Sequence, residues 1–311
     1  TAHLFGPGGE DIRHQSVRPR RHTVVFDNLL PSACYAYRTE SGGMEIGQGT
    51  LCTFKNEYEP FSFVVFGDSG YGKQAQFNIA GHIAEQNPDF IIHTGDLVYP
   101  YGQEWGYRSF FHNPYEELVK RIFFFPSMGN HDARTKRGRS LLDNFRLPQN
   151  NSYYRFVYAN MLVIALDSTR VYDPLQAHWL ESELQHSLHN PRIVWRIVFF
   201  HHPPYSNKKR DNSNAHVRTL WVPLFEKYGV DIVFSGHNHL YTRFHPQNGI
   251  VYIIEGVGGR AHYHGREDDT RVAYTFGDAY GFGVVRVHGT ALQFSHITHE
   301  GNVIDSFEIK K

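Results

Sequence analysis

The chain has 311 residues, of which 41% are hydrophobic, so its length predicts about two domains and its composition allows a sizeable core. Lys plus Arg and Asp plus Glu are equal at 31 each, so no net field favours nucleic acid or an anionic membrane surface, and a small-molecule partner held by a local site is expected. No run approaches the roughly 18 consecutive apolar residues of a membrane span. No signal pattern opens the chain, which begins at Thr1 and is expected to be a processed or trimmed product.

Residues 1–58 have the pattern of β-structure without helical periodicity. Strands are expected over residues 22–30, 33–38 and 49–55, with a turn at Ser41-Gly42-Gly43. The stretch LLPSACY, residues 29–35, resembles the tyrosine corner of fibronectin type III and related sandwiches, with Tyr35 in the corner position. Because such a sandwich takes about 100 residues, residues 1–58 are expected to form a short, incomplete module of this type.

Cys34 and Cys52 lie almost symmetrically about the turn between the second and third of these strands. On neighbouring antiparallel strands they could face each other and form a disulfide. The alternative is a pair of buried free thiols, which is what a cytosolic chain would show.

From residue 59 onward, short apolar runs alternate with helix-length amphipathic segments, which predicts an α/β layered domain over residues 59–311. Buried strands are expected over residues 61–67, 89–95, 123–129, 161–167, 195–200, 230–236 and 250–256. Helices are expected over residues 73–86, 175–188 and 217–229. Residues 281–309 lack helical spacing and are expected to form antiparallel strands that close the domain.

Polar residues follow five of these strands, at the point where each strand becomes a loop. Ligands bind at the carboxyl ends of strands in open α/β sheets, so these residues are expected to converge. They are Asp68, Asp96, Tyr99, Asn130, His131, His201, His202, His237 and His239. Singly, each has an ordinary alternative: a turn residue, a buried core histidine, or an aromatic ring under a loop. Together they predict a metal site, whose oxygen and imidazole donors suit iron, zinc or manganese.

The ordered blocks resemble the five motifs of purple acid phosphatases, within the calcineurin-like metallophosphoesterase superfamily. They are Asp68-x-Gly70, Gly95-Asp96-x-x-Tyr99, Gly129-Asn130-His131, Val198-x-x-His201 and Gly236-His237-x-His239. The resemblance covers roughly residues 60–300. It implies a layered β-sandwich of two mixed sheets flanked by helices, preceded here by the incomplete β-module.

The resemblance also implies a binuclear metal centre. Asp68, Tyr99 and His239 are expected to bind Fe(3+), and Asp96 is expected to bridge to a divalent ion, Zn, Fe or Mn. Asn130, His201 and His237 are expected to hold that divalent ion. The choice of His201 rather than His202 rests on the Val-x-x-His spacing. The implied activity is hydrolysis of phosphate monoesters by attack of a metal-bound hydroxide on phosphorus.

His131, His202 and His216 are the candidates for proton transfer to the leaving group. For His202 the alternative is a packing role, and for His216 the surrounding loop differs in length from the family pattern. A phosphodiesterase or phosphotriesterase on the same bimetal core remains open, as does a non-catalytic metal-binding or phosphate-binding module. The family resemblance implies a secreted or periplasmic location, and only on such a route would the sequon at Asn150-Asn151-Ser152 be glycosylated.

Overall fold

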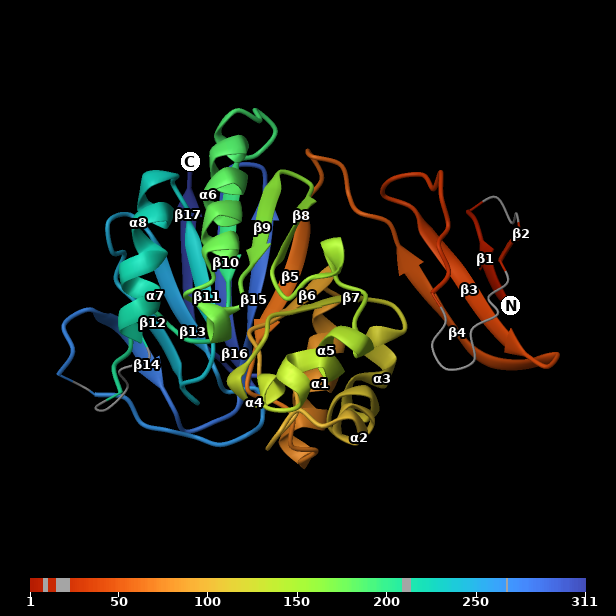
Figure 1. Cartoon of the computed structure of the whole chain (residues 1–311), viewed down its shortest axis with the longest axis horizontal. Coiled ribbons are helices and arrows are strands. Elements are labelled where there is room, and N and C mark those ends of the chain that lie inside the picture. The colour runs from red at the N-terminus through yellow and green to blue at the C-terminus, as the bar shows by residue number, and fades with distance from the viewer. Residues whose placement is uncertain (8–10, 15–22, 209–213, 267) are drawn as a thin grey trace.

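The first of the three sheets found among the described residues is N-terminal. The computed structural model describes residues 1–7, 11–14, 23–208, 214–266 and 268–311. The sheet is antiparallel with strand order β2-β1-β3-β4. Its strands are β1 (Ala2–Phe5), β2 (Asp11–His14), β3 (Cys34–Ser41) and β4 (Met44–Cys52). Figure 1 shows it set apart from the two larger sheets, to which one extended connection leads.

The prediction of a strand over residues 22–30 is wrong for the residues that the structure describes, because residues 23–30 form no strand. β1 pairs with β3 instead, and β2 pairs with the other edge of β1. This arrangement depends on pairing between distant segments, which the local pattern does not specify. His22 lies outside the described residues, as does the side chain of Asn150 in the sequon.

Tyr35 adopts the tyrosine-corner arrangement that its sequence context indicated. The backbone N–H of Leu30 donates to the Tyr35 hydroxyl at 2.9 Å, which ties the corner to a residue upstream. Cys34 and Cys52 are directly opposite each other on β3 and β4 and are joined by a disulfide. Of the two alternatives for these cysteines, the structure therefore contains the bonded pair.

The second sheet has six strands in the order β17-β16-β15-β5-β6-β7. Its strands are β5 (Phe61–Phe66), β6 (Phe90–His93), β7 (Phe123–Pro126), β15 (Gly281–His288), β16 (Ala291–Thr298) and β17 (Val303–Lys310). β5, β6 and β7 are parallel, and β15 to β17 are antiparallel, as expected for residues 281–309.

The third sheet has seven strands in the order β14-β12-β13-β11-β10-β9-β8. Its strands are β8 (Tyr154–Tyr158), β9 (Met161–Ala165), β10 (Trp195–Phe199), β11 (Ile232–Ser235), β12 (Tyr241–Phe244), β13 (Val251–Glu255) and β14 (Val272–Phe276). β9, β10, β11 and β13 are parallel to one another. β8, β12 and β14 pair antiparallel with their neighbours at the edges.

Helices join the parallel strands. The long ones are α1 (Gln74–Gln86) and α6 (Pro174–Leu188), both within one residue of their predicted bounds. The predicted helix over 217–229 is divided into α7 (Asn214–Leu220) and α8 (Val222–Lys227), with Pro in the first turn of α8. The short helices are α2 (Glu104–Gly106), the π-helix η1 (Tyr107–His112), α3 (Asn113–Val119), α4 (Asn130–Ala133), η2 (Lys136–Gly138), α5 (Arg139–Asn144), η3 (Pro148–Asn150) and η4 (Ser168–Arg170).

The two larger sheets pack face to face as a sandwich, as the resemblance implied. Fully buried Phe63 and Phe90 of one sheet share a core with Phe199 and Phe234 of the other. Each fully buried side chain of this kind contributes about 1.5–3 kcal/mol to the free energy of folding, relative to an exposed one. A second core lies on the outer face of the seven-stranded sheet, under α6, α7 and α8, where Leu180 is fully buried.

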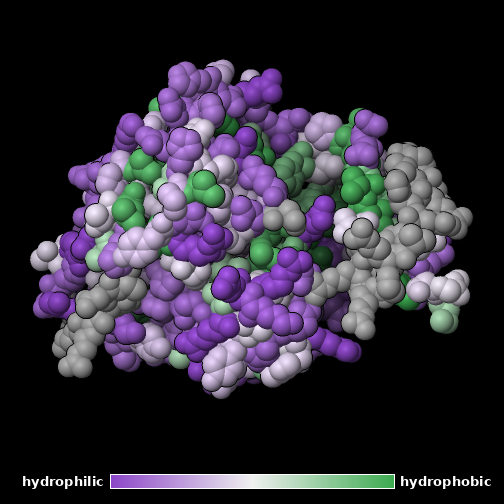
Figure 2. All heavy atoms as spheres, viewed as in Figure 1, coloured by the Kyte–Doolittle hydropathy of each residue, from purple (hydrophilic) through white to green (hydrophobic). Residues whose placement is uncertain are grey.

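Hydrophilic residues cover most of the face seen in Figure 2, with hydrophobic residues scattered between them. Among the described residues, no helix combines the length and the apolar composition needed to cross a membrane.

Candidate metal centre

The predicted ligands follow the carboxyl ends of parallel strands in both sheets of the sandwich. Asp68 follows β5, Asp96 and Tyr99 follow β6, Asn130 begins α4 after β7, His201 follows β10, and His237 and His239 follow β11. Because the two sheets pack against each other, their strand ends meet at one edge, and side chains from all five loops come together there.

A first group of donor atoms surrounds the hydroxyl of Tyr99, which is almost fully buried. This hydroxyl lies 2.9 Å from Asp68 Oδ1 and 3.0 Å from Asp96 Oδ2. It also lies 3.2 Å from His239 Nε2, which is itself 3.3 Å from Asp68 Oδ1. Two carboxylates, a phenol and an imidazole therefore point at one small volume.

A second group of donors lies beside the first. Asn130 Oδ1 is 3.0 Å from His201 Nε2 and 3.0 Å from His237 Nδ1, and these two ring nitrogens are 3.3 Å apart. His201 Nδ1 lies 2.9 Å from the carbonyl oxygen of Thr94. That carbonyl accepts the Nδ1 proton, so Nε2 of His201 is directed into the group, where it could bind a cation once it has lost its own proton.

Asp96 joins the two groups through one atom. Its Oδ2 contacts the Tyr99 hydroxyl at 3.0 Å and His201 Nε2 at 3.2 Å. The other oxygen, Oδ1, accepts from the backbone N–H of His131 at 2.8 Å, which fixes the rotation of the carboxylate. A carboxylate in this position is suited to bridge two cations, since such a pair needs shared negative charge between its members.

The backbone holds these side chains in uncommon conformations. Asp68, Asp96 and His237 have φ values of 56°, 58° and 68°, in the left-handed region that residues with a side chain seldom adopt. Each such backbone conformation lowers the stability of the fold by about 1–3 kcal/mol, and it persists only where neighbouring residues impose it. Gly129 packs closely against Asp96, because a Cβ at residue 129 would overlap the backbone nitrogen and the carboxylate of Asp96.

Two buried residues that the sequence reasoning did not single out position the loops. Asp132 accepts from the backbone N–H groups of Leu97 at 3.0 Å and Gly129 at 3.1 Å, which joins the loops after β6 and β7. His93 lies 2.8 Å from the hydroxyl of Ser69 and accepts from the Gly95 N–H at 3.2 Å, which joins the loops after β5 and β6. A histidine at the end of an otherwise apolar strand was the available signal for His93.

The charges at the centre act on one another. Burial would lower the pKa of His201, but the negative charges of Asp96 and Asp68 raise it to about 9. Burial would raise the pKa of Asp96, but the positive charge on His201 lowers it below its usual value. Burial raises the pKa of Tyr99 well above its usual value, and the two carboxylates raise it further. Without cations the centre therefore retains protons on His201 and Tyr99.

The residues present fit a pair of metal ions. The donors of the two groups lie 2.9–3.3 Å from their neighbours, and they are carboxylate, phenol, amide and imidazole atoms without a thiol. A bound cation would replace the shared protons and reverse the effect of the carboxylates on Tyr99, because metal ions are the largest local charges in such sites. The donor set suits iron, zinc or manganese.

The structure brings two of the three predicted proton donors close to the centre. The Nε2 of His131 lies 3.9 Å from Asp96 Oδ2. The ring of His202 lies 4.6 Å from that of His237, between centroids, and its Nδ1 is 2.9 Å from the Ser168 hydroxyl. Burial lowers the pKa of His202, and the charges of His201 and His237 lower it further.

His216 lies on α7 and is exposed, with its ring tilted by 57° against that of Tyr172 and the ring centroids 4.9 Å apart. None of its contacts described in the structure is with a predicted metal ligand. The preceding loop includes residues 209–213, which lie outside the described part of the chain. The role of His216 therefore stays a prediction.

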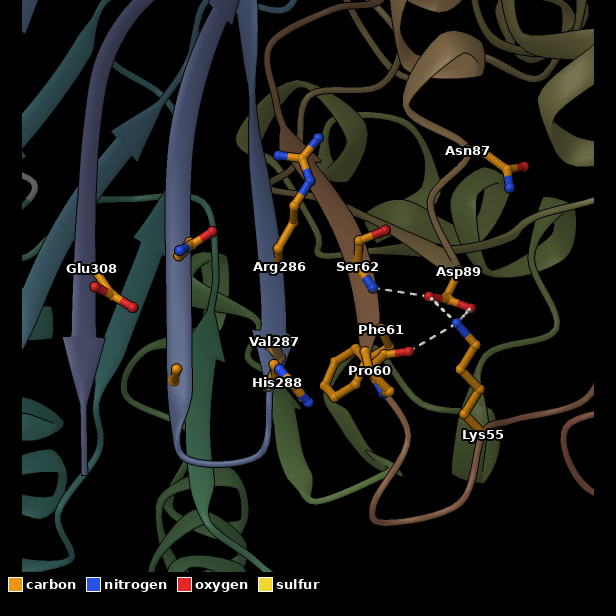
Figure 3. A pocket seen from close by; sticks show the side chains of 12 residues that line it. Lys55, Pro60, Phe61, Ser62, Asn87, Asp89, Arg286, Val287, His288 and Glu308 are labelled. Atoms are coloured by element: carbon orange, nitrogen blue, oxygen red, sulfur yellow. Dashed lines mark hydrogen bonds and ion pairs between the residues drawn. The ribbon is translucent and has the colours of Figure 1, made fainter.

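A separate pocket of about 500 Å³ lies at the opposite end of β5 from the centre. Figure 3 shows Phe61 and Ser62 of β5 beside Arg286 of β15, and Lys55 paired with Asp89. Arg286 is exposed and its guanidinium donates to Gln86 at 2.8 Å. No predicted metal ligand lines this pocket.

Two family models match the chain. Residues 61–241 match the calcineurin-like phosphoesterase family, and residues 249–306 match the family described as iron/zinc purple acid phosphatase-like protein C. Purple acid phosphatase 21 of Arabidopsis thaliana is 28% identical over 264 residues, which cover 76% of this chain and 58% of that protein. The chain thus spans a little over half the length of that curated relative, and half that of a relative from Mycobacterium tuberculosis.

Solved structures show the same fold. A purple acid phosphatase from yellow lupin seeds superposes with a TM-score of 0.78 at 20% identity, covering 91% of this chain and 60% of that one. GAP50, described as the anchor in the inner membrane complex of Plasmodium, superposes with a TM-score of 0.68 at 18% identity, covering 81% of this chain and 89% of that one. These likenesses support the architecture, whereas chemistry has to be argued from the site itself.

Proposed function

Since the chain belongs to the calcineurin-like phosphoesterase family, we propose that it is a binuclear metal-dependent phosphatase that hydrolyses phosphate monoesters. We further propose Fe(3+) at the group formed by Asp68, Tyr99 and His239. A divalent ion, Zn, Fe or Mn, would be held by Asn130, His201 and His237.

One observation carries this proposal: a single oxygen of Asp96 is shared by the two donor groups. A structural or single-metal site has no need of a buried carboxylate between two sets of ligands. Two cations about 3.5–4 Å apart clamp the attacking and leaving oxygens of an in-line displacement at phosphorus. When bound, such a pair supplies electrostatic stabilisation of the phosphoryl group and activation of water.

The chain's own residues would orient the substrate and move protons. We propose that His131, whose backbone N–H fixes Asp96, and His202, held by Ser168, contact the phosphoryl group or the leaving oxygen. His216 would supply a proton to poor leaving groups from the rim. General acids of this kind contribute about 10²–10⁴-fold to a rate.

Metal analysis followed by steady-state kinetics tests the proposal. Protein containing two metals per chain should hydrolyse nitrophenyl phosphate much faster than bis(nitrophenyl) phosphate, and removal of metal should abolish both activities. A preference for the diester would instead support the phosphodiesterase alternative. Fully loaded protein without activity on either ester would support a binding role.

We also propose an extracytoplasmic location. The disulfide between Cys34 and Cys52 supports it, because such bonds persist in oxidising compartments and are rare in the cytosol.

A further inference from the structure

Arg260 lies beside the metal centre, although no predicted motif includes it. It follows β13 and a Gly-rich turn, and its backbone N–H donates to the carbonyl oxygen of Asp68 at 3.0 Å. Its guanidinium carbon lies 4.2 Å from the ring centroid of Tyr71 and 5.1 Å from that of Tyr99. The same Tyr99 ring is covered by His131, with ring centroids 4.4 Å apart. Arg260 and His131 thus both border the Tyr99 ligand.

The guanidinium of Arg260 has no protein acceptor among the residues that the structure describes. Its Nε is buried without a hydrogen-bond partner, and no described carboxylate pairs with it. Arg243, by contrast, makes two hydrogen bonds to Asp305, and Arg271 makes two to Asp269. A buried donor that lacks an acceptor is costly, so an acceptor from outside the chain is expected at Arg260.

The aromatic contacts make Arg260 suitable for binding an anion. The guanidinium lies over the rings of Tyr71 and Tyr99, so cation–π contacts hold it, and none of its N–H groups donates to an acceptor among the described residues. The edge of a guanidinium matches two oxygens of a phosphate, to which arginine donates in a bidentate manner. The chain has a formal net charge of zero, so no overall field attracts an anionic substrate, and Arg260 would add a local positive charge beside the proposed metal ions.

We propose that Arg260 binds non-bridging phosphate oxygens of the substrate and thereby selects monoesters over diesters. This inference rests on the proposed function. A monoester dianion carries one more negative charge and one more free oxygen than a diester, and that oxygen accepts from Arg260. In a diester the position is occupied by an ester group, which carries no charge and is a poor acceptor.

Kinetics on two esters with the same leaving group test this selectivity. For Arg260→Met, we expect kcat/KM for nitrophenyl phosphate to fall about 10- to 100-fold, the range of a lost hydrogen bond to a charged group. Hydrolysis of methyl nitrophenyl phosphate should change little. Arg260→Lys, which keeps the charge but not the planar fork, should lie between the wild type and Arg260→Met.

Arg286→Met is the matched control. It removes the same charge from the remote pocket shown in Figure 3 and should leave kcat/KM for both esters unchanged. If Arg260→Met lowered both ester activities equally, or neither, the selectivity role would be refuted. If Arg260→Met fails to fold, the kcat/KM values of Arg260→Lys for the two esters are compared instead, and they test the selectivity role in the same way.

Binding of inorganic phosphate separates this inference from the proposed function. By calorimetry on metal-loaded protein, the Kd for phosphate should rise by about 10- to 100-fold in Arg260→Met and stay constant in Arg286→Met. Unchanged phosphate affinity in Arg260→Met would overturn the inference. A wild type that hydrolyses neither ester yet shows this affinity difference would refute the proposed activity alone.

Discussion

Replacement of Tyr99 by Phe isolates one hydroxyl at the centre. The ring stays, so no cavity forms, and the change removes only the contacts to Asp68, Asp96 and His239. A hydroxyl carries a single proton and therefore donates to one carboxylate at a time. The expected loss in the metal-free protein is one hydrogen bond to a charged group, about 1.5–3 kcal/mol in the free energy of unfolding.

Urea unfolding of metal-free wild type and Tyr99→Phe at neutral pH measures this loss. Tyr252→Phe is the matched control, since the buried hydroxyl of Tyr252 in β13 has no hydrogen-bond partner among the described residues. Its removal should leave stability unchanged or slightly higher. A Tyr99→Phe variant as stable as the Tyr252→Phe variant would contradict the geometry given for the hydroxyl.

The same pair of variants tests the iron ligand. If the Tyr99 phenolate binds Fe(3+), as the family resemblance implies, the oxidised wild type should show a visible charge-transfer band. Tyr99→Phe should lose the band while Tyr252→Phe keeps it. An iron-loaded, oxidised wild type without colour would refute the assignment of Tyr99 and point to another branch of two-metal phosphoesterases.

Three further predictions concern other parts of the molecule. Burial lowers the pKa of His93 from 6.5 to about 3, so as the pH falls below 6.5 the unfolded chain takes up a proton at this residue before the folded chain does. The free energy of unfolding should therefore decrease by up to about 1.4 kcal/mol for each pH unit between 6.5 and 3. His93→Gln should lack this slope in urea titrations, and an unchanged slope would contradict the burial. Replacing Cys34 and Cys52 by Ser should destabilise the N-terminal sheet by about 3 kcal/mol for a separation of 18 residues, and a thermal melt equal to the wild type would contradict it. His216→Ala should slow alkyl phosphates far more than aryl phosphates, because only an alkoxide needs the proton, and equal losses would move that role to His131 or His202.

The sequence was sufficient to predict the parallel strands of the sandwich and the side chains at their ends. Buried strands read as continuous apolar runs. His201 follows such a run directly, whereas Asp68 and Asp96 follow theirs within three residues. Their convergence follows from the rule that the carboxyl ends of parallel strands line a crevice. The spacing within each sequence block then indicates which of the two metal positions each ligand would serve. It could not show which oxygen of Asp96 is shared by the two groups.

Features that depend on distant segments could not be predicted. The segment from Glu104 to Val119 is divided into α2, the π-helix η1 and α3, with Pro114 near the start of α3, although its buried aromatic residues Tyr107, Phe111 and Tyr115 recur every fourth residue. Strand β1 exists through pairing with β3, which lies about 30 residues further along the chain. Asp132 and Arg260 act through contacts with loops after other strands, and nothing in their local sequence indicates those contacts.

Metal content and turnover of Asp96→Asn, measured on the same preparation, test the central claim most directly. The wild type should bind two metal ions per chain. Because Asp96 Oδ2 contacts both donor groups, Asp96→Asn should lower occupancy of both positions and abolish activity more completely than any other single ligand change. A variant that retained two metals per chain and near-normal turnover would contradict the bridging role of Asp96 and the binuclear centre built on it.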